Sequence, residues 1–192
     1  MEHVLEVARF LPMTTAPATT GREALAATIR AAAAGDQDAC SRLYADFVRL
    51  VHAILLGHVP RRDVDDLVQD VFVAAFTRIG ELRDPAAFGA WLAAIARNRA
   101  TDYLRRARDQ MPLPDDLPGG DPIEADTLAV LDVIRRLPEA YRETLLMRLV
   151  EGMSGAEIAE RSGLTPASVR VNLHRGMTML RKRLGSHEWV GR

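Results

Sequence analysis

The 192-residue sequence contains one cysteine, Cys40, and no hydrophobic run near the roughly 18 residues that a membrane-spanning helix requires. One cysteine cannot form a disulfide within the chain or a cysteine-based metal cluster. Its helical spacing from Leu43 and Phe47 predicts a packed core thiol. Residues 1–20 lack the basic leader of a signal peptide. We therefore expect a cytoplasmic protein that holds no metal or cofactor and does not insert directly into a membrane.

Net charge and strand signals are also scarce. The chain has 25 basic and 26 acidic residues and a formal net charge of −1, so any attraction to nucleic acid must be local. Runs of β-branched residues are few and turn signals are widely spaced, whereas alanine, leucine and arginine are abundant. This pattern favours an all-α fold.

Apolar spacing and capping signals predict two groups of helices. The expected helices lie near residues 23–34, 36–56, 60–80, 84–108, 128–136, 138–150, 154–161 and 165–184. Residues 109–126, between the two groups, contain four prolines, two glycines, six acids and no base. That composition is typical of a linker.

We therefore predict two small helical domains joined by an acidic flexible linker. The expected boundaries are a disordered N-terminal extension at 1–22, a first domain at 23–108, the linker at 109–127, a second domain at 128–185 and a C-terminal tail at 186–192.

The second domain contains the signals of a helix-turn-helix. Ser154 and Glu157 form a capping box at the start of a short helix. Gly163 marks a tight turn, and Thr165 with Pro166 starts the next helix. A helix, a short glycine-containing turn and a second helix are the parts of a common DNA-binding motif.

The second of these helices is one-sided in charge, because six bases and no acid occur between Arg161 and His187. Its apolar residues fall on one face of a helical wheel and its polar residues on the other. A solvated face is the alternative, but such faces usually mix both signs, so we favour contact with DNA. The candidate residues are Ser168, Arg170, Val171, Asn172, His174 and Arg175.

A second basic surface is predicted in the first domain. Residues 97–108 contain five arginines and one acid, Asp102, a local excess of 5 − 1 = +4. Trp91, Tyr103 and one further aromatic residue accompany them, and such a combination can bind single-stranded DNA by stacking on its bases. Burial is the usual fate of aromatic rings, so Trp91 is expected mainly in the core. Arg99 falls on the apolar face, so either its stem extends along that face or the helix is kinked.

The helix expected at 60–80 carries the opposite charge. Its exposed face presents Asp66, Gln69 and Asp70 around an apolar Val73. Paired carboxylates are typical of acid–base catalysts. No glycine-rich loop, nearby histidine or metal-ligand pattern accompanies them, so we favour a docking site for a basic protein helix.

Several motifs, in this order, resemble bacterial sigma factors. DLVQDVF at 66–72, AFGAWLAAIARN at 87–98 and DYLRR at 102–106 resemble region 2. LPEAYRE at 137–143, EGMSGAEIA at 151–159 and SVRVNLHR at 168–175 resemble region 4. With only these two regions and a short linker, the chain resembles the extracytoplasmic-function (group 4) class of the sigma-70 family.

The resemblance implies a non-catalytic promoter-specificity subunit that binds core RNA polymerase and promoter DNA. In the family, the acidic face binds the clamp helices of the largest polymerase subunit, and here it comprises Asp66, Gln69, Asp70 and the neighbouring Val73. The opened minus-ten strand would contact Arg83, Asn98, Arg99, Asp102, Arg105 and Arg106. The second helix of the helix-turn-helix would bind the minus-thirty-five element as duplex, through its six candidate residues.

The resemblance also implies an anti-sigma factor that covers the polymerase-binding faces. The acidic linker would either run through the basic interior of polymerase or act as a solvated tether. Val171 and Asn172 differ from the Ser or Arg of many relatives, so the promoter sequence does not transfer. Two other functions stay open: a stand-alone helix-turn-helix regulator, and an enzyme that uses Asp66 and Asp70.

Overall fold

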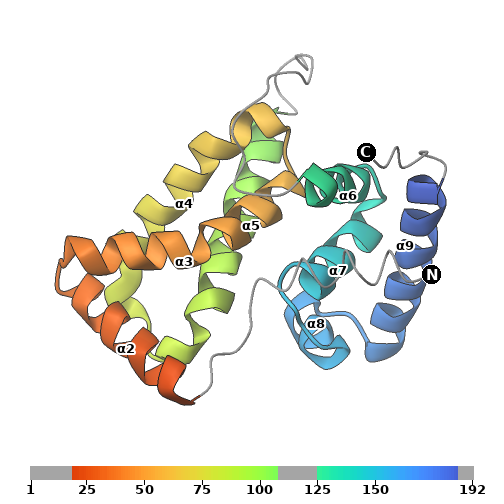
Figure 1. Cartoon of the computed structure of the whole chain (residues 1–192). Helices are drawn as coiled ribbons and strands as arrows, with labels where there is room; N and C mark the ends of the chain where they lie inside the picture. Colours follow the sequence, from red (N-terminus) through yellow and green to blue (C-terminus); the bar gives the residue numbers. More distant parts are fainter. Residues whose placement is uncertain (1–18, 108–124, 186–192) are drawn as a thin grey trace. The chain divides into compact units, whose positions relative to one another are not determined.

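The structure, a computed structural model, describes residues 19–107 and 125–185 (Figure 1). Over these two ranges it contains helices and no strand, and the chain divides into two compact units. One unit lies between Thr14 and Gly120, and the other contains Asp121–Arg192. The expected all-α fold with two helical domains is confirmed.

The first unit is a bundle in which α3 is the central helix. α3 packs against α2, α4 and α5, and α4 also packs against α5 (Figure 1). The α-helices are α2 (Thr19–Ala33), α3 (Gln37–Leu56), α4 (Val64–Arg78) and α5 (Phe88–Ala107), and short 3-10 turns are η1 (Arg61–Asp63), η2 (Ile79–Glu81) and η3 (Pro85–Ala87).

Local capping signals determine several of these helix ends. Gly35 has a φ of 90° and ends α2, and the Asp36 carboxylate accepts a hydrogen bond of 2.9 Å from the backbone N–H of Ala39 at the start of α3. Asp84 likewise accepts from Ala86 at 2.9 Å, although a 3-10 turn precedes α5 there.

Two details of the first unit differ from the sequence predictions. α2 begins at Thr19, so residues 19–22 belong to a helix and not to the N-terminal extension. Residues 1–18 lie outside the described part of the chain. Cys40 is half-buried on α3, because the helix side that points into the core is occupied by Ala39 and Leu43, which are both fully buried.

Aromatic rings join the helices of the first unit. Phe88 at the start of α5 is fully buried, and its ring centroid lies 5.0 Å from that of Phe47 on α3 in a T-shaped arrangement. The Tyr44 and Phe72 rings join α3 to α4 at 4.6 Å. These contacts hold α4 and α5 on α3 and so determine which faces of both helices stay exposed.

Trp91 and Arg99 are both half-buried in α5. The Trp91 ring lies 5.9 Å from that of Phe88, so part of it contributes to the core as expected. α5 runs without interruption from Phe88 to Ala107, which favours an extended Arg99 stem over a kink.

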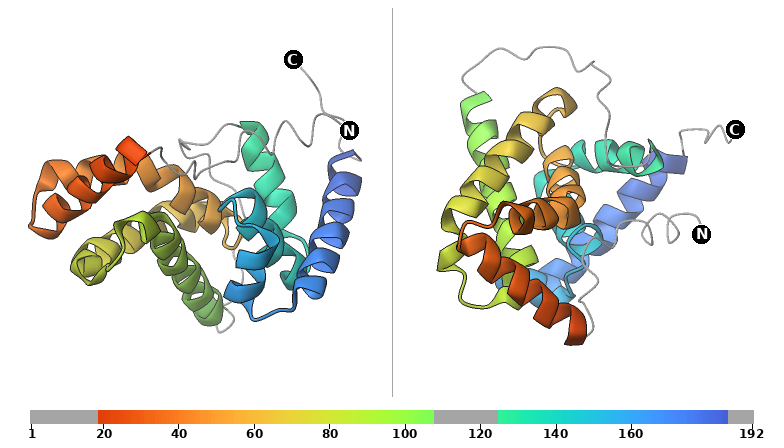
Figure 2. Two further views of the ribbon diagram at one scale, coloured as in Figure 1. Left: turned by 90° about the horizontal axis from the view of Figure 1, so that it is seen from below. Right: turned by 60° about the vertical axis from the view of Figure 1, so that its left-hand side comes forward.

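The second unit is built around α9. This helix packs against α6, α7 and α8, as two further views show (Figure 2). The helices are α6 (Ala125–Arg135), α7 (Glu139–Leu149), α8 (Gly155–Ser162) and α9 (Pro166–Gly185). α6 begins three residues before the expected domain boundary at 128. Residues 108–124, which include most of the predicted linker, and the C-terminal tail, at 186–192, lie outside the described residues.

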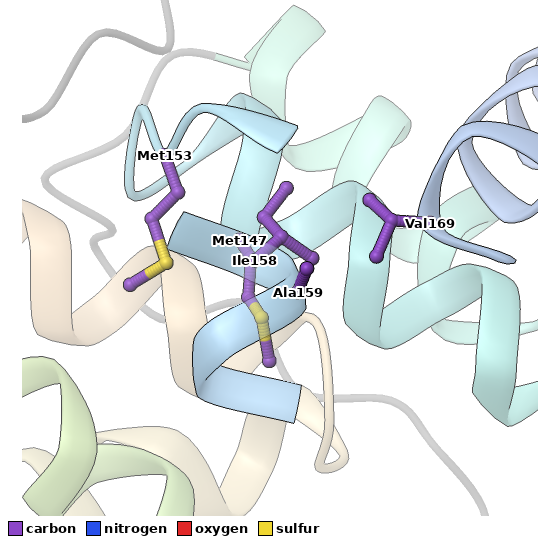
Figure 3. Close-up of a cluster of buried hydrophobic side chains, with 5 residues drawn as sticks. All are labelled: Met147, Met153, Ile158, Ala159 and Val169. Atoms are coloured by element: carbon purple, nitrogen blue, oxygen red, sulfur yellow. The ribbon is translucent and has the colours of Figure 1, made fainter. Parts of the chain in front are cut away.

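A small apolar cluster joins α7, α8 and α9. Figure 3 shows its buried side chains: Met147, Met153, Ile158, Ala159 and Val169. The half-buried Leu173 also packs against this cluster. Further along α9, Gly176 is buried against α7. A Cβ atom at Gly176 would lie 3.1 Å from Leu145 Cδ1 and 3.3 Å from Tyr141 Cβ. α7 and α9 therefore approach closely because this position lacks a side chain.

The described residues contain neither a candidate membrane-spanning helix nor a candidate metal site. No helix in the ranges 19–107 and 125–185 is long and apolar enough to cross a membrane. Over the same ranges, no group of three or more histidine, cysteine, aspartate or glutamate side chains is arranged to hold a metal ion.

We predict that Gly176→Ala destabilises the second unit by about 1 kcal/mol in total, because overpacking against the fully buried Leu145 costs about 1–3 kcal/mol and outweighs a helix-propensity gain of about 1 kcal/mol. Gly155→Ala is the matched control, since nothing lies within 4 Å of its added Cβ, and it is expected to be neutral or slightly stabilising. Hydrogen exchange of peptides from α7 and α9 in the full chain measures both effects. Equal protection in the two variants would contradict the close approach.

Candidate functional site

The outer side of α4 carries an exposed acidic face. Asp66, Gln69 and Asp70 are exposed, and Val73, one turn further, is 67% exposed. Their spacing of three and four residues places them on one side of the helix. The opposite side is buried, through Val64, Val68, Val71, Phe72 and Ala75. The predicted exposure of this face is confirmed.

Neighbouring acids of the same segment are bonded within the chain. Asp63 accepts a hydrogen bond of 2.7 Å from the Tyr103 hydroxyl, and Asp65 lies 3.3 Å from Nε2 of the buried His52. Among the described residues, no ion pair involves Asp66 or Asp70. The structure therefore separates acids that position α4 from acids that remain available to a partner.

The bond between Tyr103 and Asp63 also positions the basic end of α5. It joins residues 40 apart in the sequence and holds the last turns of α5 beside the start of α4. Burial, followed by the hydrogen bond to Asp63, raises the pKa of Tyr103, so the phenol keeps the proton that it donates. Sequence reasoning missed this contact, because Tyr103 was treated as a candidate stacking ring.

The candidate minus-ten residues fall into two classes of exposure. Arg83, Asn98, Arg105 and Arg106 are exposed, whereas Arg99 and Asp102 are half-buried. Spacings of three, four and seven residues place Trp91, Asn98, Asp102 and Arg105 on one side of α5.

Within this set, Asp102 is bonded to Arg105. Its carboxylate accepts a hydrogen bond of 2.9 Å from the Arg105 guanidinium. Asp102 thus orients the Arg105 side chain. The negative charge of Asp102 alone did not suggest a contribution to a nucleic-acid surface.

The helix-turn-helix is built by the local signals that the sequence contains. The Ser154 hydroxyl and the Glu157 carboxylate complete a capping box at the start of α8. Gly163 has a φ of 69°, in the left-handed region that favours glycine, and it ends α8. The Thr165 hydroxyl accepts a hydrogen bond of 3.1 Å from the backbone N–H of Ser168 and so caps α9.

The outward face of α9 is basic and includes one large exposed apolar residue. Arg170, His174 and Arg175 are exposed, and Val171 is 45% exposed. The inward face is anchored by Val169 and Leu180, each 1% exposed. This division agrees with the predicted wheel. It leaves the hydrogen-bonding side chains of Arg170, His174 and Arg175 exposed to solvent.

Two candidate residues of α9 are partly used within the protein. Asn172 is half-buried, and its amide lies 3.5 Å from the Ala140 carbonyl of α7, to which it donates. Ser168 is also half-buried, and its hydroxyl lies 2.9 Å from that of Thr165. Both contacts depend on packing or capping geometry, which a helical wheel does not report.

Some arginines of the second unit donate hydrogen bonds to backbone carbonyl groups of the same unit. Arg183 donates to the Arg136 carbonyl at 2.8 Å, and Arg148 donates to the Met153 carbonyl at 2.8 Å. Cations commonly satisfy carbonyl groups at helix C-termini. That tendency was the available signal for Arg183, because Arg136 follows the end of α6, whereas the Met153 carbonyl that Arg148 contacts lies in the loop before α8.

Two family models match this chain. Sigma-70 region 2 matches residues 43–110, and sigma-70 region 4 matches residues 127–180. The ECF RNA polymerase sigma-E factor of Haemophilus influenzae is 30% identical over 169 residues, which are 78% of this chain and 89% of that protein. The chain belongs to the sigma-70 family.

The Haemophilus influenzae relative is named an ECF factor, and this sigma factor belongs to the same extracytoplasmic-function class, whose members are promoter-recognising subunits of RNA polymerase. Further sigma factors are similar over most of the chain. RNA polymerase sigma factor NccH of Alcaligenes xylosoxydans xylosoxydans is 32% identical over 182 residues, 86% of this chain and 96% of that protein. The probable RNA polymerase sigma factor RfaY of Xanthomonas campestris is 34% identical over 171 residues. These are 80% of this chain but only 42% of that protein.

A solved structure shares this fold and part of the sequence. The structure of CnrH in complex with the cytosolic domain of CnrY matches this chain with a TM-score of 0.59 and 30% sequence identity. The match covers 84% of this chain and 97% of the CnrH chain. In this chain, the match to region 2 begins within α3 and ends after α5. α2 therefore precedes the matched residues in the sequence, but it packs against α3. The region 4 match covers α7 and α8 and most of α6 and α9.

The capping box of α8 predicts a pH dependence. Glu157 accepts a hydrogen bond of 2.7 Å from the Ser154 backbone N–H, and this bond lowers the pKa of Glu157. A lowered pKa in the folded state means that the carboxylate stabilises α8 above its unfolded pKa, and that this stabilisation is lost as the pH falls through the folded value. We expect acidification to reduce the hydrogen-exchange protection of α8, after correction for intrinsic rates.

Glu157→Gln should remove this acid-dependent loss, because glutamine caps in both ranges of pH. Glu160→Gln is the matched control, since Glu160 is exposed on the same helix outside the capping box. If Glu157→Gln and the wild type lost protection in parallel, the capping carboxylate would not be the titrating group.

Proposed function

We propose that this sigma factor has no catalytic activity of its own and acts through three surfaces. The acidic face of α4 binds core RNA polymerase. The exposed side of α5, with Arg83, binds the opened minus-ten strand. The outward face of α9 binds the minus-thirty-five element as duplex DNA.

The observation that carries this proposal is the acidic face of α4, in a chain that also contains a helix-turn-helix. Asp66 and Asp70 lie one helical turn apart with Val73 about one turn beyond them, and no ion pair with a described residue engages them. Such a face is complementary to a basic helix with an apolar centre. A stand-alone regulator has no use for it, and an enzyme would need its carboxylates in a pocket, whereas these side chains project into solvent.

The proposed minus-ten surface combines hydrogen bonding with charge. Asn98 is exposed, and Trp91, two turns earlier on the same side of α5, is half-buried. Arg105 and Arg106 add positive charge for the phosphates. A base drawn out of the duplex loses stacking worth a few kcal/mol, and polymerase binding would help to offset that cost.

The proposed minus-thirty-five surface uses the exposed bases of α9. An arginine that projects from a recognition helix can form two hydrogen bonds with guanine O6 and N7. Arg175 and His174 lie on the outward side, and Arg170 lies at its flank. Asn172 would reach a base only by giving up its weak bond to Ala140.

We further propose that an anti-sigma factor covers the polymerase-binding faces while the protein is inactive. The complex of the similar CnrH with the cytosolic domain of CnrY supports a protein partner of this kind. The sigma factor would then act in the cytoplasm, either free or held at the inner membrane face by that partner. The acidic linker, outside the described residues, would pass through polymerase or serve as a tether.

Replacing Asp66 and Asp70 together with arginine is expected to abolish binding to core RNA polymerase without unfolding the protein, because both side chains are exposed. Size-exclusion co-elution with bacterial core polymerase, followed by run-off transcription, measures this. The charge-matched control replaces Glu23 and Asp46, exposed acids of α2 and α3, with arginine. If the α4 variant co-eluted with core polymerase as fully as the wild type, the proposal that this face binds polymerase would be contradicted.

Replacing Arg175 with alanine is expected to cost about 1–3 kcal/mol at one base pair of the upstream element if Arg175 contacts guanine. Transcription by the reconstituted holoenzyme, on templates with every substitution at each upstream position, shows the loss and its position. Arg30→Ala, at an exposed base of α2, is the control. Unchanged selectivity in the Arg175 variant would contradict the placement of the recognition face.

A further inference from the structure

An exposed valine lies in the middle of the outward face of α9. Val171 is 45% exposed and is one of the large apolar side chains that the described residues leave open to solvent. At about 100° per residue, it lies nearly opposite the inward line of Val169, Gly176 and Leu180. Val171 therefore contributes little to the core of its own unit, and its apolar surface is available to a partner.

The residue one turn earlier extends this apolar character. Ala167 is exposed and lies four residues before Val171, on the same side of the helix. The central strip of the first turns of α9 thus has no hydrogen-bonding side chain. Arg170 and Arg175, both exposed, lie on either side of it.

The chemistry of the major groove limits what such a strip can contact. In a helix-turn-helix, the N-terminal residues of the second helix meet the base edges. A valine cannot satisfy the acceptors of guanine or the amino group of cytosine, and covering these groups without a hydrogen bond costs free energy. The apolar group of the major groove is the C5-methyl of thymine.

We propose that Val171 contacts the C5-methyl group of a thymine in the upstream promoter duplex, and that this contact makes the protein select thymine at that position. The inference rests on the proposed binding of α9 to the minus-thirty-five element. The flanking arginines supply the phosphate or guanine contacts, and the Ala167–Val171 strip supplies discrimination by a methyl group. The basic surroundings favour nucleic acid over an apolar protein surface as the occupant.

Replacement of thymine by deoxyuridine tests this directly, because it removes only the C5-methyl group and keeps base pairing. The upstream element is first selected from randomised duplexes with the holoenzyme of the full chain and core polymerase. Each thymine of the selected element is then replaced singly by deoxyuridine, and holoenzyme binding is measured by competition. We expect one position at which the replacement weakens binding about fourfold, the effect of one buried methylene-sized group.

Val171→Ala should narrow the difference between the thymine and deoxyuridine templates at that position to less than about twofold, because the shorter side chain contacts the methyl group less closely. The variant is expected to fold, because Val171 is exposed and alanine favours helix formation. Thr178→Ala is the matched control: Thr178 is exposed on the same side, and its hydroxyl donates to the His174 carbonyl at 2.9 Å. This variant should keep the fourfold difference.

Three results would overturn the inference while the proposed function stands. One is a selected element in which no deoxyuridine replacement weakens binding. Another is a Val171→Ala holoenzyme that retains the full fourfold difference. The third is a Val171→Ala variant that weakens binding to all templates equally and still discriminates the methyl group, which would place Val171 against a protein. If no upstream element were selected at all, the proposed role of α9 would fail with it.

Discussion

The face that α9 presents to solvent depends on how closely the helix approaches α7. Gly176 permits this approach, since even a Cβ atom there would lie within 3.1 Å of the Leu145 side chain. With Val169 and Leu180 also buried, the rotation of α9 about its own axis is set by the packing of its inward side. Arg175, His174 and Val171 are exposed as a consequence. A recognition surface made of one helix side is therefore as well defined as the apolar contact behind it.

In the first unit, too, contacts within the fold decide which side chains stay exposed, and here the side chains are acidic. Its segment from residue 63 to 70 contains several acids, and the fold divides them by their contacts. Asp63 receives the Tyr103 hydroxyl, and Asp65 lies beside the buried His52, so these two help to hold the start of α4. Asp66 and Asp70 project from the side that the aromatic contacts of α3 leave open. The acids proposed to bind polymerase are those that the fold does not use.

Much of the helical framework was predictable, because its signals act over three or four residues. Gly35 and Asp36, the Ser154 capping box and Gly163 mark helix ends by backbone conformation or short hydrogen bonds, and the structure contains each of them. The start of α2 was missed by four residues, since its threonines and glycine resemble a loop in composition. Cys40 was assigned to the core from spacing alone, and it lies at the border of the buried side.

By itself, the sequence determined that the chain is helical, where most helices begin and end, and which side of each helix is apolar, because these properties depend on near neighbours. Only the tertiary structure decided which polar residues remain free. The contacts from Tyr103 to Asp63, Asn172 to Ala140 and Arg183 to Arg136 join residues 40, 32 and 47 positions apart. Such contacts exist only after the helices have packed, so no local pattern reports them.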